Sequence, residues 1–376
     1  MNKKAKLLFL IPSLRGGGAE RVAVNLIPFL SKYFDLTLVL LENKIEYELP
    51  EADFNLISIS KELNSIKGHL INTPFHIAKF YRLVKSLSPD IVLSFMEQAN
   101  ILNLAVSKLT KHKTIITQHV VPSKQFSHKG LLGKVIFETS KRLYNSTQSI
   151  IAVSKGVRDD LYKSYSIKKH IIVIPNPIDF DFIKRKSLEL PGIKLTQKFF
   201  LCPGRLVIAH KAQDLLLRAF KKVLLSSPSV LLLFAGDGPD LFKLEALSKD
   251  LGISNNVIFL GWRKDLWPLM NCSIATVLAS RYEGWPMVLI EAMAAGSPVI
   301  ATDCPHGPKE ILDDGRLGML VSMEDENALS KAMIKMLSEK TRNYYKKLGE
   351  KRAKEFDINL IGMKYVNEIL RVLKNN

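Results

Sequence analysis

The sequence predicts an α/β protein made of two doubly wound, Rossmann-like domains that face each other across a cleft. Short apolar runs alternate with helical patterns along the whole chain, which is typical of parallel sheets with crossover helices. This alternation stops in a charged, irregular stretch at residues 179–197 and then restarts. At 376 residues, the chain also exceeds the size at which a single hydrophobic core usually stops growing. We therefore expect a domain boundary near residue 178.

The apolar runs define the expected strands of each sheet. In the first half they are residues 7–11, 36–41, 91–95, 114–117, 149–153 and 171–174. In the second half they are residues 199–202, 230–235, 257–260, 273–277, 299–302 and 318–321, with helices expected at 212–226 and 241–251. In open sheets of this kind, ligands bind outside the carboxyl ends of the strands. Residues that follow these runs are accordingly the first candidates for a site.

Composition limits the class of partner and the compartment. The formal charge is +18, which suits nucleic acid, anionic lipid or phosphorylated substrates without choosing among them. Cys202, Cys272 and Cys304 are widely spaced, which favours free thiols in a reducing compartment over a zinc site or a disulfide framework. The first apolar run is too short for an export signal, and no run is long enough to span a bilayer. Any membrane association should therefore be peripheral.

The most informative segment is residues 281–296. Pro286 suits the first helical position and Gly296 suits the position after the last one, so a helix is expected at 287–295. Glu291 falls among apolar neighbours in this helix, and Glu283 precedes it. A buried carboxylate needs a partner, and the free amides at a helix start bind anions. The segment indicates a phosphate site flanked by acceptors for hydroxyls, although paired acids for glycoside hydrolysis are also consistent with it.

Further candidates follow other expected strands. Gly17 and Gly18 open a helix after the first strand, where their amides can approach a phosphate or a sugar, although a plain tight turn is equally expected. Arg205 follows the strand at 199–202, and Lys211 lies at the expected start of the next helix. These two cations can converge on a diphosphate without a metal, or can be solvated surface residues. His119 ends a strand and can donate to a sugar hydroxyl or to a developing charge, or be structural.

A basic stretch with interleaved apolar residues follows His119. Its cations are Lys124, Lys129, Lys134, Lys141 and Arg142. Basic and apolar residues at helical spacing suit an anionic bilayer surface. An ordinary amphipathic helix packed on its own core gives the same pattern.

The order of these motifs resembles that of the retaining family-four glycosyltransferases. GGGAER, NPID, GRL with a following lysine, AGDGP, FLGW and EGWPMVLIEAMAAGSPVIATD occur in this order through nearly the whole chain. The resemblance implies a glycosyltransferase-B fold that needs no metal or other cofactor. It implies an acceptor-binding domain at 1–178, a domain at 179–358 that binds the nucleotide-sugar donor, and a C-terminal helix at 359–376 that returns to the first domain.

The resemblance also implies roles for individual residues. Glu283 would position the transferred sugar, and His119 would contact the sugar and help to stabilise the transition state. Arg205 and Lys211 would bind the donor diphosphate, and Glu291 would hold the ribose. The glycines would approach the donor or the acceptor, and the amides near Met287 and Val288 would receive phosphate. In full, the implied substrate-binding residues are Gly17, Gly18, Arg205, Lys211, Met287, Val288 and Glu291.

These expectations combine into one hypothesis. The chain would transfer a hexose or N-acetylhexosamine, with retention, from a UDP-sugar to a growing, lipid-linked surface glycan. It would be cytoplasmic and peripherally bound to the inner face of an anionic cell membrane. Two alternatives remain open: a basic nucleic-acid-binding protein without transferase activity, and a sugar-nucleotide epimerase or phosphorylase on the same fold. No recognised nucleic-acid motif occurs, so nucleic acid is not the expected partner.

Overall fold

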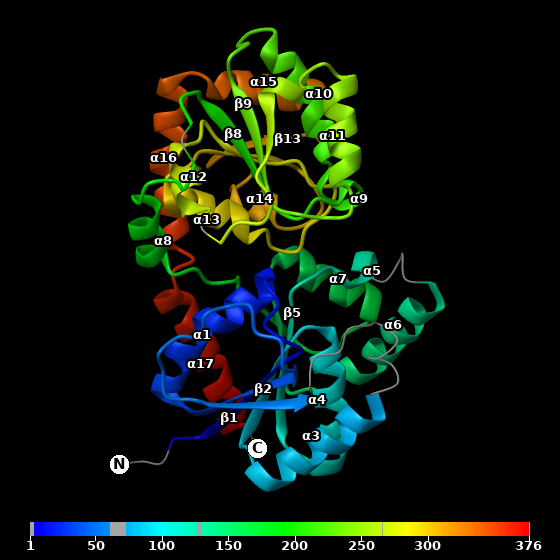
Figure 1. The fold of residues 1–376 in the computed structure, drawn as a ribbon. Helices are drawn as coiled ribbons and strands as arrows, with labels where there is room; N and C mark the ends of the chain where they lie inside the picture. The colour runs from blue at the N-terminus through cyan, green and yellow to red at the C-terminus, as the bar shows by residue number, and fades with distance from the viewer. Residues whose placement is uncertain (1–3, 61–72, 126–129, 194, 265, 376) are drawn as a thin grey trace. The chain divides into compact units, whose positions relative to one another are not determined.

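The fold is described from a computed structural model of the chain (Figure 1). The structure describes residues 4–60, 73–125, 130–193, 195–264 and 266–375. The chain forms two compact units. The first combines Met1–Pro177 with Ile358–Asn376, and the second is Ile178–Asp357.

The first unit alternates strands and helices and ends with the last helix of the chain. Its elements are β1 (Lys6–Ile11), α1 (Gly18–Tyr33), β2 (Asp35–Glu42), β3 (Asn55–Ser60), α3 (Thr73–Leu87), β4 (Ile91–Phe95), α4 (Glu97–Thr110), β5 (Lys113–Gln118), α5 (Pro122–Gln125), α6 (Gly130–Tyr144), β6 (Ser149–Ala152), α7 (Lys155–Tyr165), β7 (Ile171–Val173) and α17 (Ile358–Lys374).

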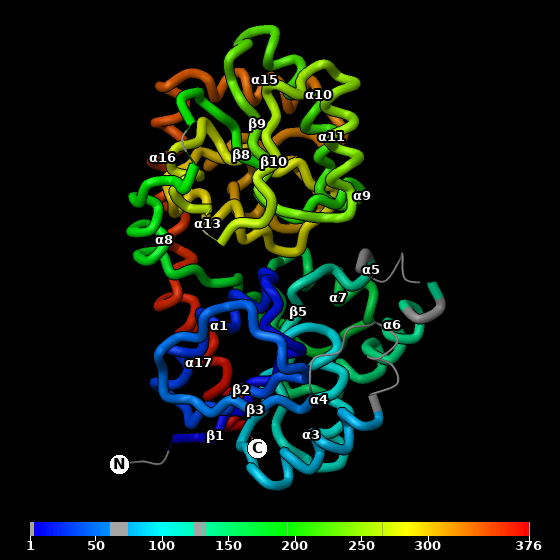
Figure 2. Tube along the Cα trace, in the orientation of Figure 1, coloured from blue at the N-terminus to red at the C-terminus, as the bar shows by residue number. Residues whose placement is uncertain are grey.

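All seven strands of the first unit run parallel in the order β3-β2-β1-β4-β5-β6-β7. β1 is buried along nearly its whole length, as expected for a central strand with helices on both faces. Helices α1 and α17 pack against each other on one face, and α3, α4 and α6 form the opposite layer (Figure 1). The tube in Figure 2 shows how the first and last helices of the chain come to lie together.

The second unit repeats the same architecture with a smaller sheet. Its elements are α8 (Phe180–Ser187), β8 (Phe199–Pro203), α9 (Ile208–Lys211), α10 (Gln213–Leu224), β9 (Leu231–Ala235), α11 (Leu241–Asp250), the 3-10 turn η1 (Ser254–Asn256), β10 (Val257–Phe259), α12 (Trp267–Cys272), β11 (Thr276–Leu278), α13 (Met287–Ala295), β12 (Val299–Thr302), α14 (Pro308–Ile311), β13 (Met319–Val321), α15 (Glu326–Met336) and α16 (Glu339–Lys354).

The six strands of the second unit are also all parallel, in the order β10-β9-β8-β11-β12-β13. Helices α10, α11 and α15 pack together, while α8, α12, α13 and α16 form a second group. The core contains Phe200, Phe220 and Phe234, all fully buried. Two Rossmann-like α/β units, as predicted, therefore make up the chain.

The predicted elements differ from the observed ones in a few places. The edge strand β3 was not predicted, because its sequence NLISIS is half polar and its side chains are largely exposed. The strand expected at 273–277 instead begins at Thr276, because the Ser273 hydroxyl bonds to the Met270 carbonyl where α12 ends. Helix α13 has the expected bounds, but Pro286 is its N-cap rather than its first residue. Gly296 ends the helix with a φ of 88°, as a C-terminal glycine should.

The described helices include none that is long and apolar enough to cross a membrane. All three cysteines are free thiols, with Cys202 and Cys304 buried and Cys272 exposed. The expectation that they form no disulfide is confirmed.

Candidate functional site

Strand order reverses between β8 and β11 in the second sheet, and several candidate residues follow these two strands. Chain order runs from β8 through β9 to β10 on one side and from β11 to β13 on the other. In doubly wound sheets, the crevice at such a reversal is where ligands bind. Arg205 comes directly after β8, and Glu283 follows β11. The fold thus brings these two predicted residues to the same end of one sheet.

Lys211 and Glu283 are in direct contact at this end of the sheet. Lys211 Nζ lies 2.6 Å from Glu283 Oε1, and their side chains are 19% and 9% exposed. The Ser280 hydroxyl donates to the same oxygen at 2.6 Å. Burial raises the pKa of Glu283, but the Lys211 charge and these hydrogen bonds outweigh it, so the pKa lies below its ordinary value of 4.5. The site holds an ionised carboxylate that is almost removed from water.

The segment that carries Lys211 is a single helical turn with unusual backbone geometry. Lys211 ends α9 rather than beginning the following helix, which corrects the sequence prediction. Ala212 separates α9 from α10 with a φ of 48°, a left-handed conformation that glycine adopts more readily. The His210 ring stacks on Tyr282 at 4.2 Å between centroids, and its Nε2 lies 2.9 Å from the Tyr282 carbonyl. These contacts tie α9 to the residues just before Glu283.

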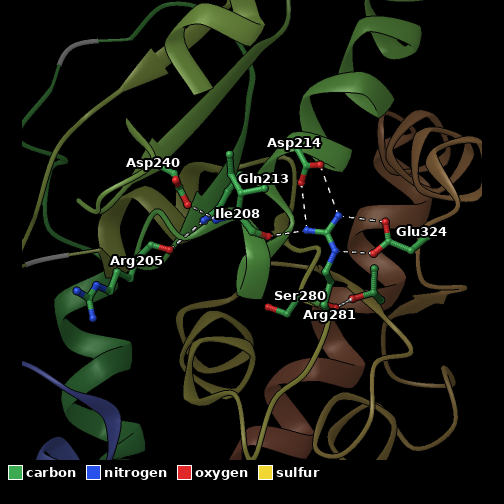
Figure 3. A network of polar contacts seen from close by, with 9 residues as sticks. Arg205, Ile208, Gln213, Asp214, Asp240, Ser280, Arg281 and Glu324 are labelled. Carbon is green, nitrogen blue, oxygen red and sulfur yellow. Dashed lines mark hydrogen bonds and ion pairs between the residues drawn. The ribbon is translucent and has the colours of Figure 1, made fainter. Parts of the chain in front are cut away.

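Arg205 differs from Lys211 in that its charged group is exposed. Its backbone carbonyl accepts a hydrogen bond from the buried Gln213 amide at 2.9 Å, which fixes the main chain. Within the described ranges its guanidinium has no hydrogen bond or ion pair, and Figure 3 shows it extending away from the neighbouring polar network. The adjoining turn is tight, because a Cβ at Gly236 would overlap the Gly204 carbonyl. Arg205 is therefore an exposed cation on a rigid loop.

Helix α13 begins beside Glu283 and has no side-chain cap at its N-terminus. The amides of Met287 and Val288 belong to its first turn, whose N–H groups have no partner within a helix. Glu291 and Val288 are the only residues of α13 that are partly exposed; the other seven are buried. An uncapped helix start lies where the sequence predicted one, whereas Glu291 is less buried than the sequence suggested.

At the end of β1, the glycine run opens α1 with Gly17 as its N-cap and Gly18 as its first residue. A side chain at Gly17 would collide with the Glu20 carboxylate. Glu20 occupies the third helical position, from which an acid can reach back to the helix start. Burial raises its pKa. The Glu20 carboxylate is the flexible end of a side chain and can shift, so this contact alone does not require glycine there.

His119 follows β5 and is only 9% exposed. Its Nε2 lies 2.9 Å from the Thr117 hydroxyl, and its ring packs 4.5 Å from that of Phe95. Burial lowers the pKa of His119 to about 3, although the nearby Asn176 side chain opposes this shift. In the described part of the chain, His119 Nδ1 and Asn176 Oδ1 are both buried without a hydrogen bond. His119 is therefore a neutral ring with one open nitrogen, so it can bind a hydroxyl but carries no charge near pH 7.

Sequence reasoning did not single out a buried polar cluster at the junction of β4 and α4. Glu97 Oε2 lies 2.8 Å from the Tyr144 hydroxyl, and Oε1 lies 3.2 Å from that of Tyr165. Burial raises the pKa of Glu97. The preceding residue, Met96, has a φ of 72°, a strained conformation for a non-glycine residue. The only sequence signal was an acid directly after a strand, which is too common to be informative.

Two Rossmann-like units, one with a charged site at its sheet reversal, are typical of the glycosyltransferase-B class of folds. Two family models match the chain, "Glycosyltransferase Family 4" over residues 16–182 and "Glycosyl transferases group 1" over residues 184–355. The chain is 32% identical over 355 residues to the N-acetylgalactosamine-N,N'-diacetylbacillosaminyl-diphospho-undecaprenol 4-alpha-N-acetylgalactosaminyltransferase of Campylobacter jejuni, covering 94% of this chain and 96% of the relative. The chain belongs to this glycosyltransferase family and is a glycosyltransferase.

Other relatives and solved structures agree with this assignment. The lipopolysaccharide 1,6-galactosyltransferase of Salmonella typhimurium is 27% identical over 278 residues, 73% of this chain and 72% of the relative. The crystal structure of Anabaena Alr3699/HepE in complex with UDP and glucose superposes with a TM-score of 0.79 at 18% identity, over 98% of this chain and 100% of that one. The structural likeness confirms the predicted glycosyltransferase-B fold.

Proposed function

We propose that the chain moves a hexose or N-acetylhexosamine from a UDP-sugar to a hydroxyl of a lipid-linked glycan, with retention and without a metal. The observation that carries this proposal is the buried Lys211–Glu283 pair, 2.6 Å apart, beside an exposed Arg205 and an uncapped helix start. Cations and amides suit a diphosphate, and an adjacent ionised carboxylate suits the hydroxyls and developing positive charge of a sugar. The relatives transfer N-acetylgalactosamine and galactose, to judge from their names.

The proposed reaction breaks the bond between the anomeric carbon and the diphosphate oxygen. The leaving diphosphate gains negative charge, which Arg205, Lys211 and the amides of Met287 and Val288 stabilise by preorganised electrostatics. The acceptor hydroxyl attacks on the face that the diphosphate leaves, and its proton passes to the departing phosphate oxygen, so configuration is retained. Glu283 positions the sugar and stabilises its oxocarbenium character.

Other residues that the sequence predicted take supporting roles in this proposal. Glu291, half-buried on α13, holds the ribose of the donor. His119 contacts the transferred sugar through its open ring nitrogen, and as a neutral group it stabilises the transition state by hydrogen bonding rather than by charge. Gly17 and Gly18 place the start of α1 close to donor or acceptor. The second unit is the donor-binding domain, and the first unit binds the acceptor.

The proposal assigns the positive charge of the site to protein groups in place of a metal. Within the described ranges, no three His, Cys, Asp or Glu side chains are placed to hold a metal ion. If Arg205, Lys211 and the α13 amides supply this charge, activity should persist after dialysis against EDTA. Loss of activity that added Mg²⁺ or Mn²⁺ restores would refute metal independence.

The proposal also places the enzyme peripherally on an anionic cytoplasmic membrane surface, through α3 and α6, which both pack on α4. On α3, Phe75 is 44% exposed with Lys79 above its ring, and on α6 Val135 is 56% exposed next to an exposed Lys134. Of the basic stretch predicted from the sequence, residues 126–129 lie outside the described part. Flotation with phosphatidylglycerol vesicles, but not with phosphatidylcholine vesicles, is the expected result.

The decisive experiment incubates the purified protein with a panel of UDP- and GDP-sugars and a bacterial membrane lipid extract. Transfer to an extractable lipid from a UDP-sugar, with an α-linked product from an α-linked donor, is expected. Product formed without an acceptor would indicate an epimerase, and dependence on free phosphate would indicate a phosphorylase. Glu291→Ala should weaken UDP binding in calorimetry about tenfold, because a ribose hydrogen bond to a charged group is lost.

A further inference from the structure

Arg281 makes an unusually complete set of contacts for a side chain that is 28% exposed. Its Nε and Nη2 donate to the two carboxylate oxygens of Glu324 at 2.7 and 3.1 Å. Its Nη1 donates to the Ile208 carbonyl at 2.5 Å, and both terminal nitrogens face the Asp214 carboxylate at 3.3 and 3.5 Å. Figure 3 shows the guanidinium between these groups. All five N–H groups of the side chain therefore have acceptors.

These contacts join Arg281 to the adjoining helices α9 and α10 and to a residue far from them in sequence. Ile208 begins α9, Asp214 lies in the first turn of α10, and Glu324 follows β13. The backbone adds a further link, because the Arg281 amide donates to the His210 carbonyl at 2.8 Å. Arg281 thus connects α9 to the loop after β11 through both its main chain and its side chain.

Helix α9 depends on such external bonds. It is only four residues long, and an isolated turn of this length is not stable in water. The Asp240 carboxylate accepts from the Ile208 amide at 2.9 Å at the beginning of the turn. Arg281 holds the Ile208 carbonyl and the His210 carbonyl, and Lys211 is the next residue. The direction in which Lys211 points is therefore set by groups outside its own helix.

We propose that Arg281 is a positioning residue of the donor site, whose guanidinium holds α9 against the loop after β11 and so keeps Lys211 at Glu283. This inference rests on the proposed function, because it assigns to Lys211 and Glu283 their roles toward the diphosphate and the sugar. Arg281 does not itself bind the donor, since its five donors are occupied within the protein. Arg205 differs from Arg281, because its guanidinium is exposed and so can bind the donor. The planar fork of arginine is required, because a lysine cannot bind Glu324 in bidentate fashion and reach the Ile208 carbonyl together.

The test measures kcat and donor KM for Arg281→Gln and Arg281→Lys, each alone and combined with Lys211→Met. Arg281→Gln should lower kcat about 100-fold, as expected for a displaced catalytic group, while donor KM changes less than about threefold. Arg281→Lys should not restore activity. In the Lys211→Met background, Arg281→Gln should lower kcat by less than about a further threefold, because both changes remove the same contribution to catalysis. The acid limb of the kcat profile should also move to higher pH in Arg281→Gln.

Two companion variants keep the test informative if Arg281→Gln folds poorly. Glu324→Gln removes the bidentate partner from a side chain that is 57% exposed, and should lower kcat about fivefold, again without further effect in the Lys211→Met background. Arg316→Gln breaks a comparable ion pair with Asp313 at 2.7 Å on the surface and should leave kcat unchanged.

The outcomes separate this inference from the function on which it rests. Additive losses with Lys211→Met, or an unchanged pH profile, in an otherwise active enzyme overturn the positioning role alone. A wild-type protein that transfers no sugar from any nucleotide donor overturns both proposals. Calorimetry with UDP on every variant identifies which case holds, because the positioning role predicts that UDP binding weakens by less than about fivefold.

Discussion

The strand ends that carry the candidate residues differ in chemistry between the two units. At the ends of β8 and β11, the second unit carries Arg205, Lys211 and Glu283, which are charged and partly balanced by one another. At the ends of β4 and β5, the first unit carries Glu97 and His119, whose shifted pKa values both favour the neutral form. The same fold therefore provides one site with charges for an anion and one with neutral hydrogen-bonding groups for hydroxyls.

Burial raises the pKa of an acid at both sites, but opposing interactions outweigh it at only one of them. Burial raises the pKa of both Glu283 and Glu97. Lys211, 2.6 Å from Glu283, reverses the effect in the second unit. The hydrogen bonds that Glu97 receives from tyrosines are too weak to do so. A single cation thus decides in which direction the pKa of a buried acid shifts.

Glu283→Gln should have the largest effect. The amide keeps the shape of the side chain but loses the charge that positions the sugar and stabilises its developing positive charge, so kcat should fall about 100- to 1000-fold. UDP affinity should change less than about threefold, since UDP has no sugar at that position. Steady-state kinetics and calorimetry measure the two quantities. Glu189→Gln, which breaks an exposed pair with Lys186 at 2.7 Å, is the matched control, and near-wild-type activity in Glu283→Gln would remove Glu283 from the mechanism.

Lys211→Met should have the second-largest effect on kcat, and this effect depends on pH. In the wild type, Glu283 has a depressed pKa, so its charge, and the stability that it contributes, is present above about pH 4.5 and is lost as pH falls through the depressed value. Without Lys211, burial is opposed only by His210 and the Ser280 hydrogen bond, so the pKa of Glu283 rises. We expect kcat to fall about 100-fold and the acid limb of the kcat profile to move to higher pH. An unchanged limb in this variant, with Lys186→Met as control, would mean that Lys211 does not hold the Glu283 charge.

A similar contrast separates the features that could be predicted from the sequence from those that could not. The apolar runs predicted both sheets, and the segment 281–296 predicted helix α13. Buried strands and helix boundaries each have a local signal in the sequence. Arg205 and Lys211 were identified because they follow a strand. The Arg281–Glu324 contact spans 43 residues, and no local pattern encodes it. Spatial proximity of this kind follows only from the assembled sheet.

The first unit was harder to predict for the same reason. Glu97 meets Tyr144 and Tyr165 only after α4, α6 and α7 have packed together. His119 was identified by its place after β5, but its neutral state depends on burial, which a sequence position does not reveal. Because burial lowers the pKa of His119 to about 3, any contact with the sugar would come from a neutral ring.

His119→Ala should have a smaller effect than either charged-site variant, because a neutral hydrogen bond is lost rather than a charge. We expect kcat/KM to fall about tenfold, with partial recovery in His119→Gln. Because its pKa is lowered to about 3, His119 should produce no inflection between pH 5 and 8. His112→Gln is the control, since His112 lies 2.9 Å from Asn103 at the opposite end of β5 and should affect stability alone. An inflection near pH 6.5 that disappears in His119→Gln would show that the ring is charged during the reaction.

Glu97→Gln should have the smallest effect, and this effect is on stability. The sign of its pH dependence tests whether Glu97 is neutral. Tyr144 has one hydroxyl proton but faces two acceptors, Glu97 Oε2 at 2.8 Å and Gln118 Oε1 at 3.0 Å, so a protonated Glu97 supplies the missing donor. Because the folded pKa is raised, the stability that Glu97 contributes is complete below about pH 4.5 and declines as pH rises towards the folded value. The wild type should thus lose stability relative to Glu97→Gln between pH 5 and 8.

This difference in the free energy of unfolding should be about 1 kcal/mol or less near pH 5 and should increasingly favour the glutamine variant as pH rises. All three tryptophans, Trp262, Trp267 and Trp285, lie in the second unit, so tryptophan fluorescence does not report on Glu97. Hydrogen exchange in peptides from β4 and α4 measures the stability around Glu97 instead. A wild type that instead gains stability over Glu97→Gln as pH rises would show that Glu97 is ionised, and that the first unit also holds a buried charge.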